Sequence, residues 1–236
     1  MIELAGIRLH AYGLLIGLGI YVAWEISRKF GKIEEKILDK MVFGLIVSGV
    51  AGARIYHVVD LWEYYSKNIS KIFFLWNGGL GIWGALIGGA FYLAIFCYFN
   101  KLNFRNTLDS IVIGVPFAQA VGRLGNWVNG ELIGKNGEPL FAWEAGLNVL
   151  LGMLLIYLYR LPCSRLGGQV ARNDEQVGFV SGVYLIGYGV IRIALENFRP
   201  DDIIWRIGGV PTAVIFGVVA ILVGFVFILC HKKTLS

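Results

Sequence analysis

Long hydrophobic runs, separated by short polar segments, make up most of the chain. Seven of these runs reach the roughly 20 residues that an α-helix needs to cross a bilayer, and they lie near 11–27, 41–60, 79–99, 107–128, 141–159, 178–198 and 210–230. The segments between them are too short to form a separate soluble domain. The pattern therefore predicts an all-α integral membrane protein with about seven transmembrane helices, built as a single polytopic membrane domain over residues 1–236.

The composition agrees with this prediction. Hydrophobic residues make up 57% of the 236 residues and charged residues only 16%, whereas a soluble domain holds about 25% charged residues. The first hydrophobic run has some features of a signal peptide. Glu3 and Arg8 precede it, however, and no cleavage site of small residues follows it, so we interpret it as a retained span.

Lysine and arginine are distributed unevenly between alternate loops, and cytoplasmic loops carry the excess of positive charge. One set of loops holds twelve of these residues: Arg28, Lys29, Lys32, Lys36, Lys40, Lys101, Arg105, Arg160, Arg165, Arg172, Lys232 and Lys233. The other set holds six: Arg8, Lys67, Lys71, Lys135, Arg199 and Arg206. We therefore predict an external N-terminus and a cytoplasmic C-terminus. Much of the net charge of +5 then lies at the cytoplasmic rim, where it can meet anionic lipid, and no nucleic-acid partner is needed to explain it.

Three arginines, Arg54, Arg123 and Arg192, lie inside the second, fourth and sixth predicted spans. Each stands about 8–9 Å below the external surface, given the rise of an α-helix. A single arginine at this depth can extend its side chain to the headgroups. Three arginines at matched depth favour a functional site in the outer leaflet, because charges inside a membrane are costly.

Further polar residues share this layer. Four of them recur every four residues along the sixth span: Tyr184, Tyr188, Arg192 and Glu196. This spacing places them on one helix face, where Arg192 and Glu196 could pair.

The fourth and fifth spans add to the same layer. Gln119, Arg123 and Asn126 share one face of the fourth span, and Pro116 can bend the helix below them. Glu144 stands at the outer end of the fifth span. Glu144 and Glu196 could serve only to balance the arginines, an interpretation that is compatible with a functional site.

A glycine-rich segment, Gly78-Gly79-Leu80-Gly81-Ile82-Trp83-Gly84, opens the third span. Successive glycines can let backbone N–H groups converge on an anion. Close packing of helices through Gly84-x-x-x-Gly88 explains part of the run equally well. Beside arginines, which bind phosphate bidentately, the segment suggests a phosphate-bearing ligand such as a phospholipid headgroup.

The cysteines and histidines narrow the chemistry. Cys97, Cys163 and Cys230 all map to the cytoplasmic side, so a cysteine nucleophile at the arginine layer would have to arrive with a substrate. The three histidines are dispersed, and no pair has the spacing of metal ligands. We therefore predict neither a metal site nor a cofactor.

The segment Gly122–Gly134, with the sequence GRLGNWVNGELIG, resembles the signature of the bacterial prolipoprotein diacylglyceryl transferases. The resemblance covers most of the chain. It includes four other segments: His10-Ala11-Tyr12-Gly13, Gly52-Ala53-Arg54, Trp76–Gly89 and Tyr188–Asp201.

This resemblance implies a seven-span enzyme of the bacterial cell (inner or plasma) membrane. Such an enzyme moves the diacylglyceryl group of phosphatidylglycerol to the lipobox cysteine thiol in the signal peptide of a prolipoprotein. A thioether forms and glycerol phosphate leaves. Arginines at the phosphate would stabilise the charge that develops on this leaving group.

The resemblance also assigns roles to single residues. Arg123 and Arg192 match the family's motif arginines, and Tyr12 matches a family tyrosine at the entrance of the site. Asn126, Asn129 and Glu131 match the signature and are expected to orient the headgroup and the arginines. The expected phospholipid ligands are these three and Arg54, Gly78, Gly79, Tyr188 and Glu196.

The chain departs from the family pattern at Trp83, where relatives normally carry a histidine that is a usual candidate for the base. His57 lies three residues after Arg54 and could substitute as the base, or it could be an interfacial aromatic residue. Alternatively, an electropositive pocket could favour the thiolate without a base. A third reading is a catalytically silent homologue that only binds lipid or lipopeptide.

Two further departures are smaller. Trp127 replaces the usual phenylalanine, and the external stretch 135–140 is shorter than in many relatives, which reduces the surface for recognising a protein substrate. A lipid transporter is the alternative from another class. It would need polar residues through the whole membrane thickness, whereas the inner halves of these spans are almost uncharged apart from Glu25 and Asp109.

Overall fold

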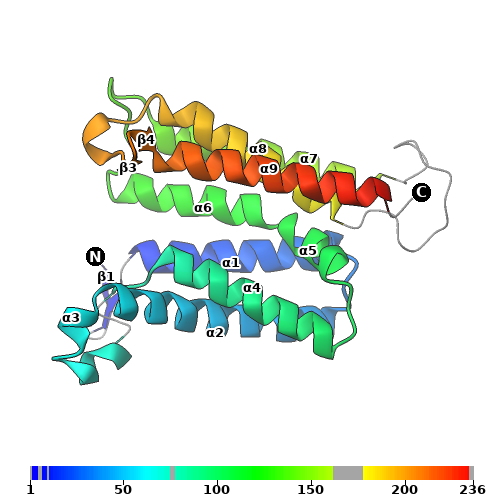
Figure 1. Cartoon of the computed structure of the whole chain (residues 1–236), viewed down its shortest axis with the longest axis horizontal. Helices are drawn as coiled ribbons and strands as arrows, with labels where there is room; N and C mark the ends of the chain where they lie inside the picture. Colours follow the sequence, from blue (N-terminus) through cyan, green and yellow to red (C-terminus); the bar gives the residue numbers. More distant parts are fainter. Residues whose placement is uncertain (1, 5–6, 10, 75–77, 162–177, 234–236) are drawn as a thin grey trace. The chain divides into compact units, whose positions relative to one another are not determined.

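The computed structural model describes residues 2–4, 7–9, 11–74, 78–161 and 178–233. Long helices dominate the chain (Figure 1). The helices are α1 (Ala11–Phe30), α2 (Glu35–Asp60), α3 (Trp62–Tyr65), η1 (Ile69–Phe73), α4 (Ile82–Phe99), α5 (Phe104–Val112), α6 (Val115–Val128), α7 (Leu140–Arg160), α8 (Phe179–Glu196), η4 (Asp201–Ile203) and α9 (Thr212–Lys233). Two short antiparallel hairpins complete the described elements, β1 (Ile2–Leu4) with β2 (Ile7–Leu9), and β3 (Arg206–Ile207) with β4 (Val210–Pro211).

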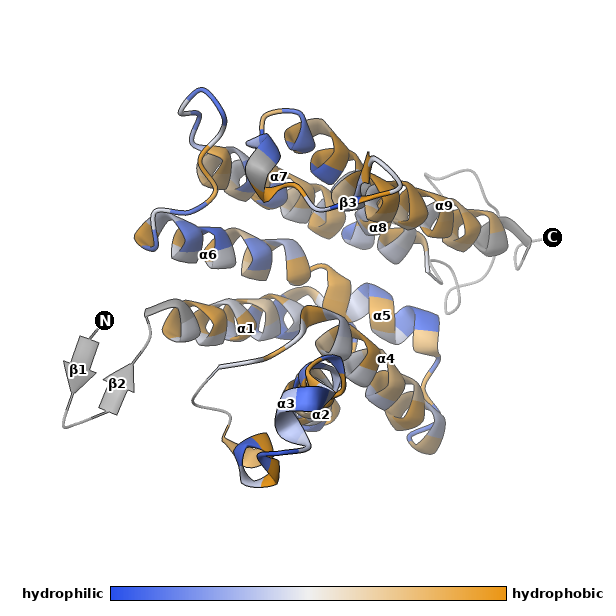
Figure 2. Cartoon of the chain, turned by 60° about the vertical axis from the view of Figure 1, so that its left-hand side comes forward, coloured by the Kyte–Doolittle hydropathy of each residue, from blue (hydrophilic) through white to orange (hydrophobic). Residues whose placement is uncertain are grey.

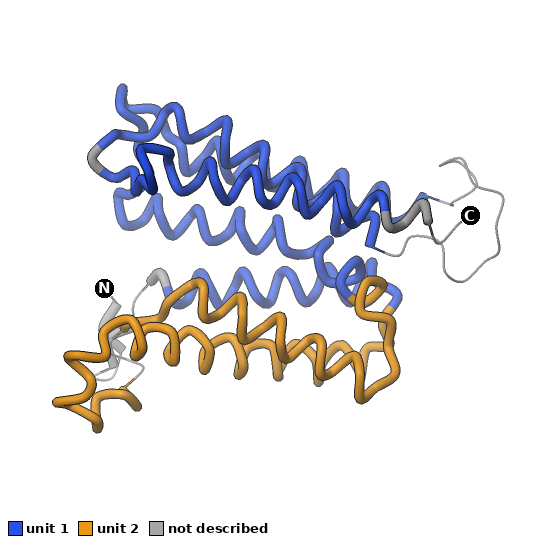
Figure 3. Tube along the Cα trace, in the orientation of Figure 1, with its two compact units in different colours: residues 1–32, 108–236 blue, residues 33–107 orange. Residues whose placement is uncertain are grey.

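The helices form two compact units, shown in different colours in Figure 3. Unit 1 consists of residues 1–32 and 108–236, and unit 2 consists of residues 33–107. Unit 1 therefore holds Arg123 and Arg192, and unit 2 holds Arg54.

Unit 2 is built on the antiparallel pair α2 and α4. Three glycines let the two backbones touch: a Cβ at Gly52 would collide with the Gly84 carbonyl, and one at Gly88 would stand 2.6 Å from the Ser48 carbonyl oxygen. This contact confirms that Gly84-x-x-x-Gly88 serves helix packing. The glycine segment thus joins the start of α4 closely to α2.

Unit 1 contains two further antiparallel pairs with the same kind of contact. A Cβ at Gly19 of α1 would lie 3.0 Å from the Ala118 carbonyl oxygen of α6. Between α8 and α9, Cβ atoms at Gly182 and Gly189 would lie 2.8 and 2.6 Å from carbonyl oxygens of Gly224 and Gly217. Helix α7 contacts both α6 and α8. The order of neighbours is therefore α1, α6, α7, α8, α9.

The predicted span 107–128 is not continuous, because a turn at Ile113 and Gly114 separates α5 from α6. Pro116 explains the break, since it lacks an N–H and its ring would clash with the carbonyl four residues earlier. The break is buried in the core of unit 1, where Ile113 packs with Leu155 and Val180.

A buried carboxylate ties α5 to α8 at this end of unit 1. Asp109 accepts hydrogen bonds from the backbone N–H groups of Gly178 and Ser181, at 2.9 and 2.8 Å, and from the Ser181 hydroxyl. It thereby caps the N-terminus of α8, where a negative charge also complements the helix dipole. Asp109, one of the two charged residues in the inner halves of the predicted spans, thus has a structural role.

Five described helices are long and apolar enough to cross a membrane: α2, α4, α7, α8 and α9 through Leu229. Figure 2 shows the hydrophobic colour along α4, α7 and α9, and hydrophilic residues on the short helices α3 and α5. The structure therefore agrees with a helical membrane protein. Helix α1 matches the predicted span 11–27 in position, but it and the interrupted span 107–128 are not among the five.

Candidate active site

A buried carboxylate in unit 1 is shared by two arginines. Glu144 Oε1 on α7 lies 2.5 Å from Nη2 of Arg123 on α6 and 3.6 Å from Nη1 of Arg192 on α8. Only 2% of the Glu144 side chain is exposed, whereas 24% and 20% of the two arginine side chains are exposed. The carboxylate is thus enclosed behind two guanidinium groups that remain partly open.

The helix ends explain why these three residues meet. Helix α6 ends at Val128 and α8 ends at Glu196, so Arg123 and Arg192 lie in the last turns of their helices. Helix α7 begins at Leu140, after Pro139, and places Glu144 in its second turn. The end of α6, the start of α7 and the end of α8 therefore bring their charged residues to one level.

The signature segment continues this network. Arg123 Nη1 donates to Asn126 Oδ1 at 3.2 Å, and Asn126 Nδ2 donates to Glu131 Oε2 at 3.1 Å. Asn129 Nδ2 reaches the other oxygen of Glu131 at 3.4 Å. The three signature residues thus form a chain that ends on Arg123, an arrangement suited to orienting its guanidinium.

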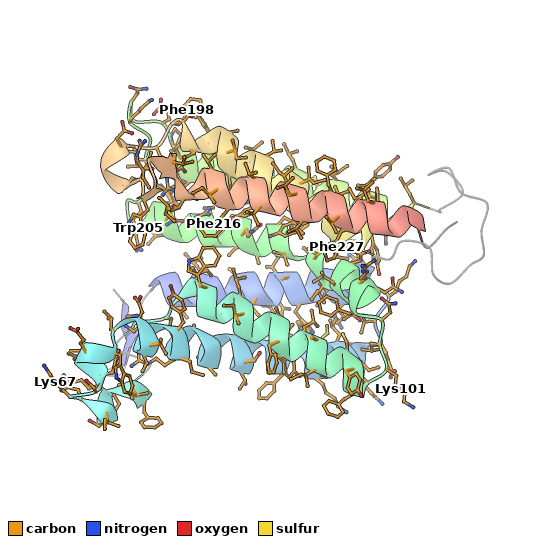
Figure 4. The ribbon with its side chains drawn as sticks, viewed as in Figure 1. Lys67, Lys101, Phe198, Trp205, Phe216 and Phe227 are labelled. Atoms are coloured by element: carbon orange, nitrogen blue, oxygen red, sulfur yellow. The ribbon has the colours of Figure 1, made fainter. Side chains whose placement is uncertain are left out.

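The loop after the signature is held by backbone hydrogen bonds near both of its ends. The N–H of Lys135 donates to the Phe198 carbonyl beyond α8 at 2.9 Å, and the N–H of Gly134 donates to the Glu138 carbonyl at 2.7 Å. The Asn136 side chain bonds the Glu138 carboxylate at 2.9 Å and holds the pKa of that carboxyl below its usual value. Figure 4 shows Phe198 and Trp205 at the same end of unit 1, with Phe227 farther along α9.

The polar stripe of α8 is present, but its pairing differs from the prediction. Arg192 contacts Glu144 rather than Glu196, and Glu196 Oε2 lies 3.4 Å from Nη1 of Arg199. Arg199 follows the last turn of α8, where its backbone N–H bonds the Glu196 carbonyl, so its side chain is close to Glu196. The partner of Arg192 is thus Glu144 from another helix, and not Glu196, which the helical spacing suggested.

The inner part of the stripe consists of stacked rings. Tyr184 and Tyr188 stack with ring centroids 5.9 Å apart, and the Tyr184 hydroxyl accepts a hydrogen bond from Gln119 Nε2 at 3.0 Å. The stripe therefore runs from Glu196 down to a tyrosine pair and joins the polar face of α6.

In unit 2, Arg54 has a very different environment. Its Nε, both N–H groups of Nη1 and both of Nη2 donate to backbone carbonyls, namely those of Ile72, Gly78, Gly79, Lys71 and Phe74, at 2.6–3.3 Å. The guanidinium also lies 5.3 Å from the Tyr65 ring centroid, and the residue is 6% exposed. All five of its donors are occupied. A phosphate could bind Arg54 only after these bonds break.

The same contacts revise the expectation for Gly78 and Gly79. Their carbonyl oxygens accept from Arg54, at 2.8 and 3.0 Å, so these two residues contribute acceptors rather than an anion cradle in this structure. Both have positive φ, +81° and +77°, which glycine adopts without strain. A Cβ at Gly79 would also collide with the His57 ring.

The remaining residues are the predicted site residues His57 and Tyr12, and Trp83, which departs from the family pattern. His57 is half-buried and packs edge-on against Tyr65, with ring centroids 5.9 Å apart. Trp83 lies in the first turn of α4 and is 39% exposed. Tyr12 is in α1, but its side chain lies outside the described residues.

The sequence did not point to Asn148, and it gave Gln119 no role at the site. Asn148, one turn after Glu144 on α7, is 0% exposed, and neither atom of its amide has a hydrogen-bond partner among the described residues. Gln119 Oε1 and Arg123 Nε are also buried without a partner in the described part of the chain. An asparagine four residues after a glutamate in an apolar span was the available signal.

Comparison with known proteins gives consistent matches over almost the whole chain. The family model described as prolipoprotein diacylglyceryl transferase matches residues 1–230. The phosphatidylglycerol–prolipoprotein diacylglyceryl transferase of Streptococcus uberis is 31% identical, over 98% of this chain and 94% of its own length. The proteins of the same name from Finegoldia magna and Parasynechococcus marenigrum are 29% and 30% identical, over 97% and 90% of this chain and 93% and 83% of their own lengths.

Proposed function

Since the chain belongs to the prolipoprotein diacylglyceryl transferase family and is a transferase, we propose that it transfers the diacylglyceryl group of phosphatidylglycerol to the lipobox cysteine of a prolipoprotein. The observation that carries this proposal is the pair Arg123 and Arg192 around Glu144. Two partly exposed guanidinium groups that already share one anion form a suitable site for the phosphate of a phospholipid.

The reaction makes one bond and breaks one. The cysteine sulfur attacks the glyceryl carbon that carries the phosphate ester, and a carbon–sulfur bond forms. The carbon–oxygen bond breaks, its electron pair stays on the oxygen, and glycerol phosphate leaves with an additional negative charge. Arg123 and Arg192 stabilise this charge, which is larger in the transition state than in the bound lipid.

Other residues support the two arginines. Asn126, Asn129 and Glu131 fix the orientation of Arg123 through their hydrogen-bond chain. Tyr188 lies one turn before Arg192 on the same stripe of α8 and is proposed to contact the lipid headgroup, and Glu196 pairs with Arg199. Tyr12 contributes at the entrance of the site.

Arg54, Gly78 and Gly79 have a supporting role in this proposal. Their mutual hydrogen bonds shape the segment that leads into α4. Phosphate binding is therefore left to the arginines of unit 1, whose donors are only partly used within the described part of the chain.

The thiol proton has two possible acceptors. His57 can take it directly, or the electropositive site can favour a thiolate that loses its proton to solvent. His57→Phe separates the two, because phenylalanine preserves the ring contact with Tyr65. Loss of turnover with an unchanged melting temperature assigns the base to His57, and retained turnover assigns deprotonation to the solvent.

The membrane placement follows the same proposal. The chain crosses the inner or plasma membrane of a bacterium seven times, with α1 and the interrupted segment 107–128 added to the five apolar helices. The N-terminus lies outside and the C-terminus lies in the cytoplasm. The arginine site then faces the outer leaflet, where secreted prolipoproteins emerge.

The decisive experiment uses purified protein, labelled phosphatidylglycerol and a lipobox peptide. The expected products are a peptide carrying a diacylglyceryl thioether and one equivalent of glycerol phosphate. Arg123→Ala and Arg192→Ala are the inactive controls, and a serine in place of the peptide cysteine is the substrate control. Retained turnover in Arg123→Ala would reject the assigned phosphate role.

The competing function is a silent lipid-binding homologue, for which Trp83 at the position of the family's histidine is the specific observation. This alternative predicts binding of phosphatidylglycerol without either product. The absence of product, under conditions in which a histidine-bearing relative reacts, would favour it.

A further inference from the structure

The buried amide of Asn148 has no hydrogen-bond partner in the described part of the chain, although Asn148 lies one turn after Glu144 on α7. Neither Oδ1 nor Nδ2 has a hydrogen-bond partner among the described residues, and the residue is 0% exposed. Burial of an unpaired amide is unfavourable, and native proteins rarely leave one without a reason. The surroundings of Asn148 therefore need an explanation.

The residue one turn earlier on α7 supplies a candidate partner. Side chains at positions i and i+4 of a helix are neighbours, so the carboxylate of Glu144 and the amide of Asn148 can meet on the same face of α7. In this structure the Glu144 carboxylate instead contacts Arg123 and Arg192. Glu144 thus pairs with the two arginines in this structure and leaves the amide of Asn148 as a second available partner.

The two arginines have unused capacity on their exposed side. Arg123 donates two of its five N–H groups to partners in the described part of the chain. Arg192 has one polar side-chain contact there, the ion pair with Glu144. A phosphate approaching from this side meets donors that are already partly neutralised by the Glu144 carboxylate. An arriving anion and the carboxylate therefore compete for the same guanidinium groups.

We propose that Glu144 is a displaceable anion: it occupies the two arginines until a lipid phosphate binds them, and its carboxylate then turns to the amide of Asn148. This inference rests on the proposed function and adds a positioning role for two residues. The unpaired amide is the second partner held ready for the carboxylate. Release of the product is the reverse step, in which Glu144 returns to the arginines and expels glycerol phosphate.

The first test measures the affinity of the purified protein for phosphatidylglycerol in mixed micelles of a neutral detergent. Glu144→Gln keeps the size of the side chain and removes the competing charge. We expect its dissociation constant for the lipid to fall by about three- to ten-fold, which corresponds to about 0.7–1.4 kcal/mol. The matched control is Glu63→Gln, because Glu63 is an exposed glutamate of α3, and its affinity should equal that of the wild type.

The second test uses Asn148→Leu, which removes the amide and keeps the branched shape and the number of heavy atoms of the side chain. Because an unpaired buried polar group disappears, the melting temperature should rise or stay constant. Lipid affinity should nevertheless fall by about three- to ten-fold, since the displaced carboxylate then lacks its partner. In the Glu144→Gln background the same substitution should not weaken binding. Asn148→Ala serves as a second variant if leucine does not fit.

The outcomes separate this inference from the proposed function. If the wild type neither binds phosphatidylglycerol nor gives product, the proposed function fails. If the wild type binds and reacts but Glu144→Gln binds the lipid more weakly, Glu144 is a fixed anchor and the displacement is rejected. Unchanged affinity in Asn148→Leu would also reject it. A merely structural role of Asn148 predicts changes in stability and in affinity of the same sign.

Discussion

Arg54 in unit 2 and the pair Arg123 and Arg192 in unit 1 are the same type of residue in opposite situations. Five backbone carbonyls take every donor of Arg54, and the residue is 6% exposed. The other two arginines share one carboxylate and keep about a fifth of their side chains exposed. The position of an arginine within an apolar segment therefore indicates that its burial costs free energy. Its hydrogen-bond and ion-pair partners indicate its role.

The difference has a physical basis. A guanidinium saturated by neutral carbonyls keeps its charge, but it offers no free N–H to a ligand. A guanidinium paired with a carboxylate can exchange that anion for another at modest cost, because the number of charge-assisted hydrogen bonds is preserved. Arg54 is therefore suited to holding a loop, and the pair in unit 1 is suited to binding an anion.

The largest expected effect comes from replacing the paired arginines by lysine. Arg123→Lys and Arg192→Lys preserve the charge beside Glu144 and remove the planar fork that binds phosphate bidentately. We expect kcat/KM for lipid and peptide to fall by about a thousand-fold, equivalent to about 4 kcal/mol, while the melting temperature stays nearly constant.

The control for these variants is Arg206→Lys, which changes an exposed arginine paired with Asp201. Its turnover should equal that of the wild type. Full activity in Arg123→Lys would mean that positive charge alone is sufficient at this position. The guanidinium group would then not account for the contrast with Arg54.

The next effect concerns stability. Arg54→Ala removes the donors of five backbone carbonyls, so the free energy of unfolding should fall by about 3 kcal/mol. Thermal or denaturant unfolding in detergent measures this loss. An Arg54→Ala variant with normal stability and no turnover would instead indicate a direct role in the reaction.

A smaller effect is expected from the glycines that accept from Arg54. Gly79→Ala combines a φ of +77° with a collision against His57, and it should cost about 2 kcal/mol of stability. Gly78→Ala is the matched control, because its φ is +81° but nothing lies within 4 Å of an added Cβ. It should cost only about 1 kcal/mol, which is the backbone strain alone. Equal losses would show that the contact with His57 contributes nothing.

The smallest expected effect tests whether unit 1 also contains a purely structural charge. Asp109→Asn weakens the cap of α8 and should lower the free energy of unfolding by about 1 kcal/mol. Asp201→Asn is the control, because Asp201 has a highly exposed side chain paired with Arg206 and should change stability by less than about 0.5 kcal/mol. A loss of turnover in Asp109→Asn without a loss of stability would contradict the capping role.

Several helices could be predicted well from the hydrophobic pattern. The predicted spans 41–60, 141–159 and 178–198 correspond closely to α2, α7 and α8, since a run of apolar residues has few alternatives to a helix in a membrane. The span 107–128 was predicted as one helix, with a bend at Pro116, because its average composition is apolar. Pro116 and the packing at Ile113 decide the break there, and hydropathy does not register either of them.

The candidate site was predictable in its residue types and less so in its pairings. Arg123, Arg192 and Asn126 stood out as polar residues of predicted spans, and Glu131 was expected from the family resemblance. The structure places these four residues in one network with Glu144. Arg192 was paired with Glu196 because helix spacing considers only residues on the same helix. The use of the Gly78 and Gly79 carbonyls could not be foreseen, since a glycine offers both a donor and an acceptor.

The sequence by itself determined that this is a helical membrane protein and showed which charged residues interrupt its apolar segments, because the cost of burying charge depends on residue type and local hydropathy. Only the tertiary structure decided the partner of each arginine. Glu144 reaches Arg123 across 21 positions of the chain, and Arg54 finds its acceptors in the loop that leads into α4. Hydrogen bonds act over about 3 Å, so their partners depend on how the helices pack and not on the order of residues along the chain.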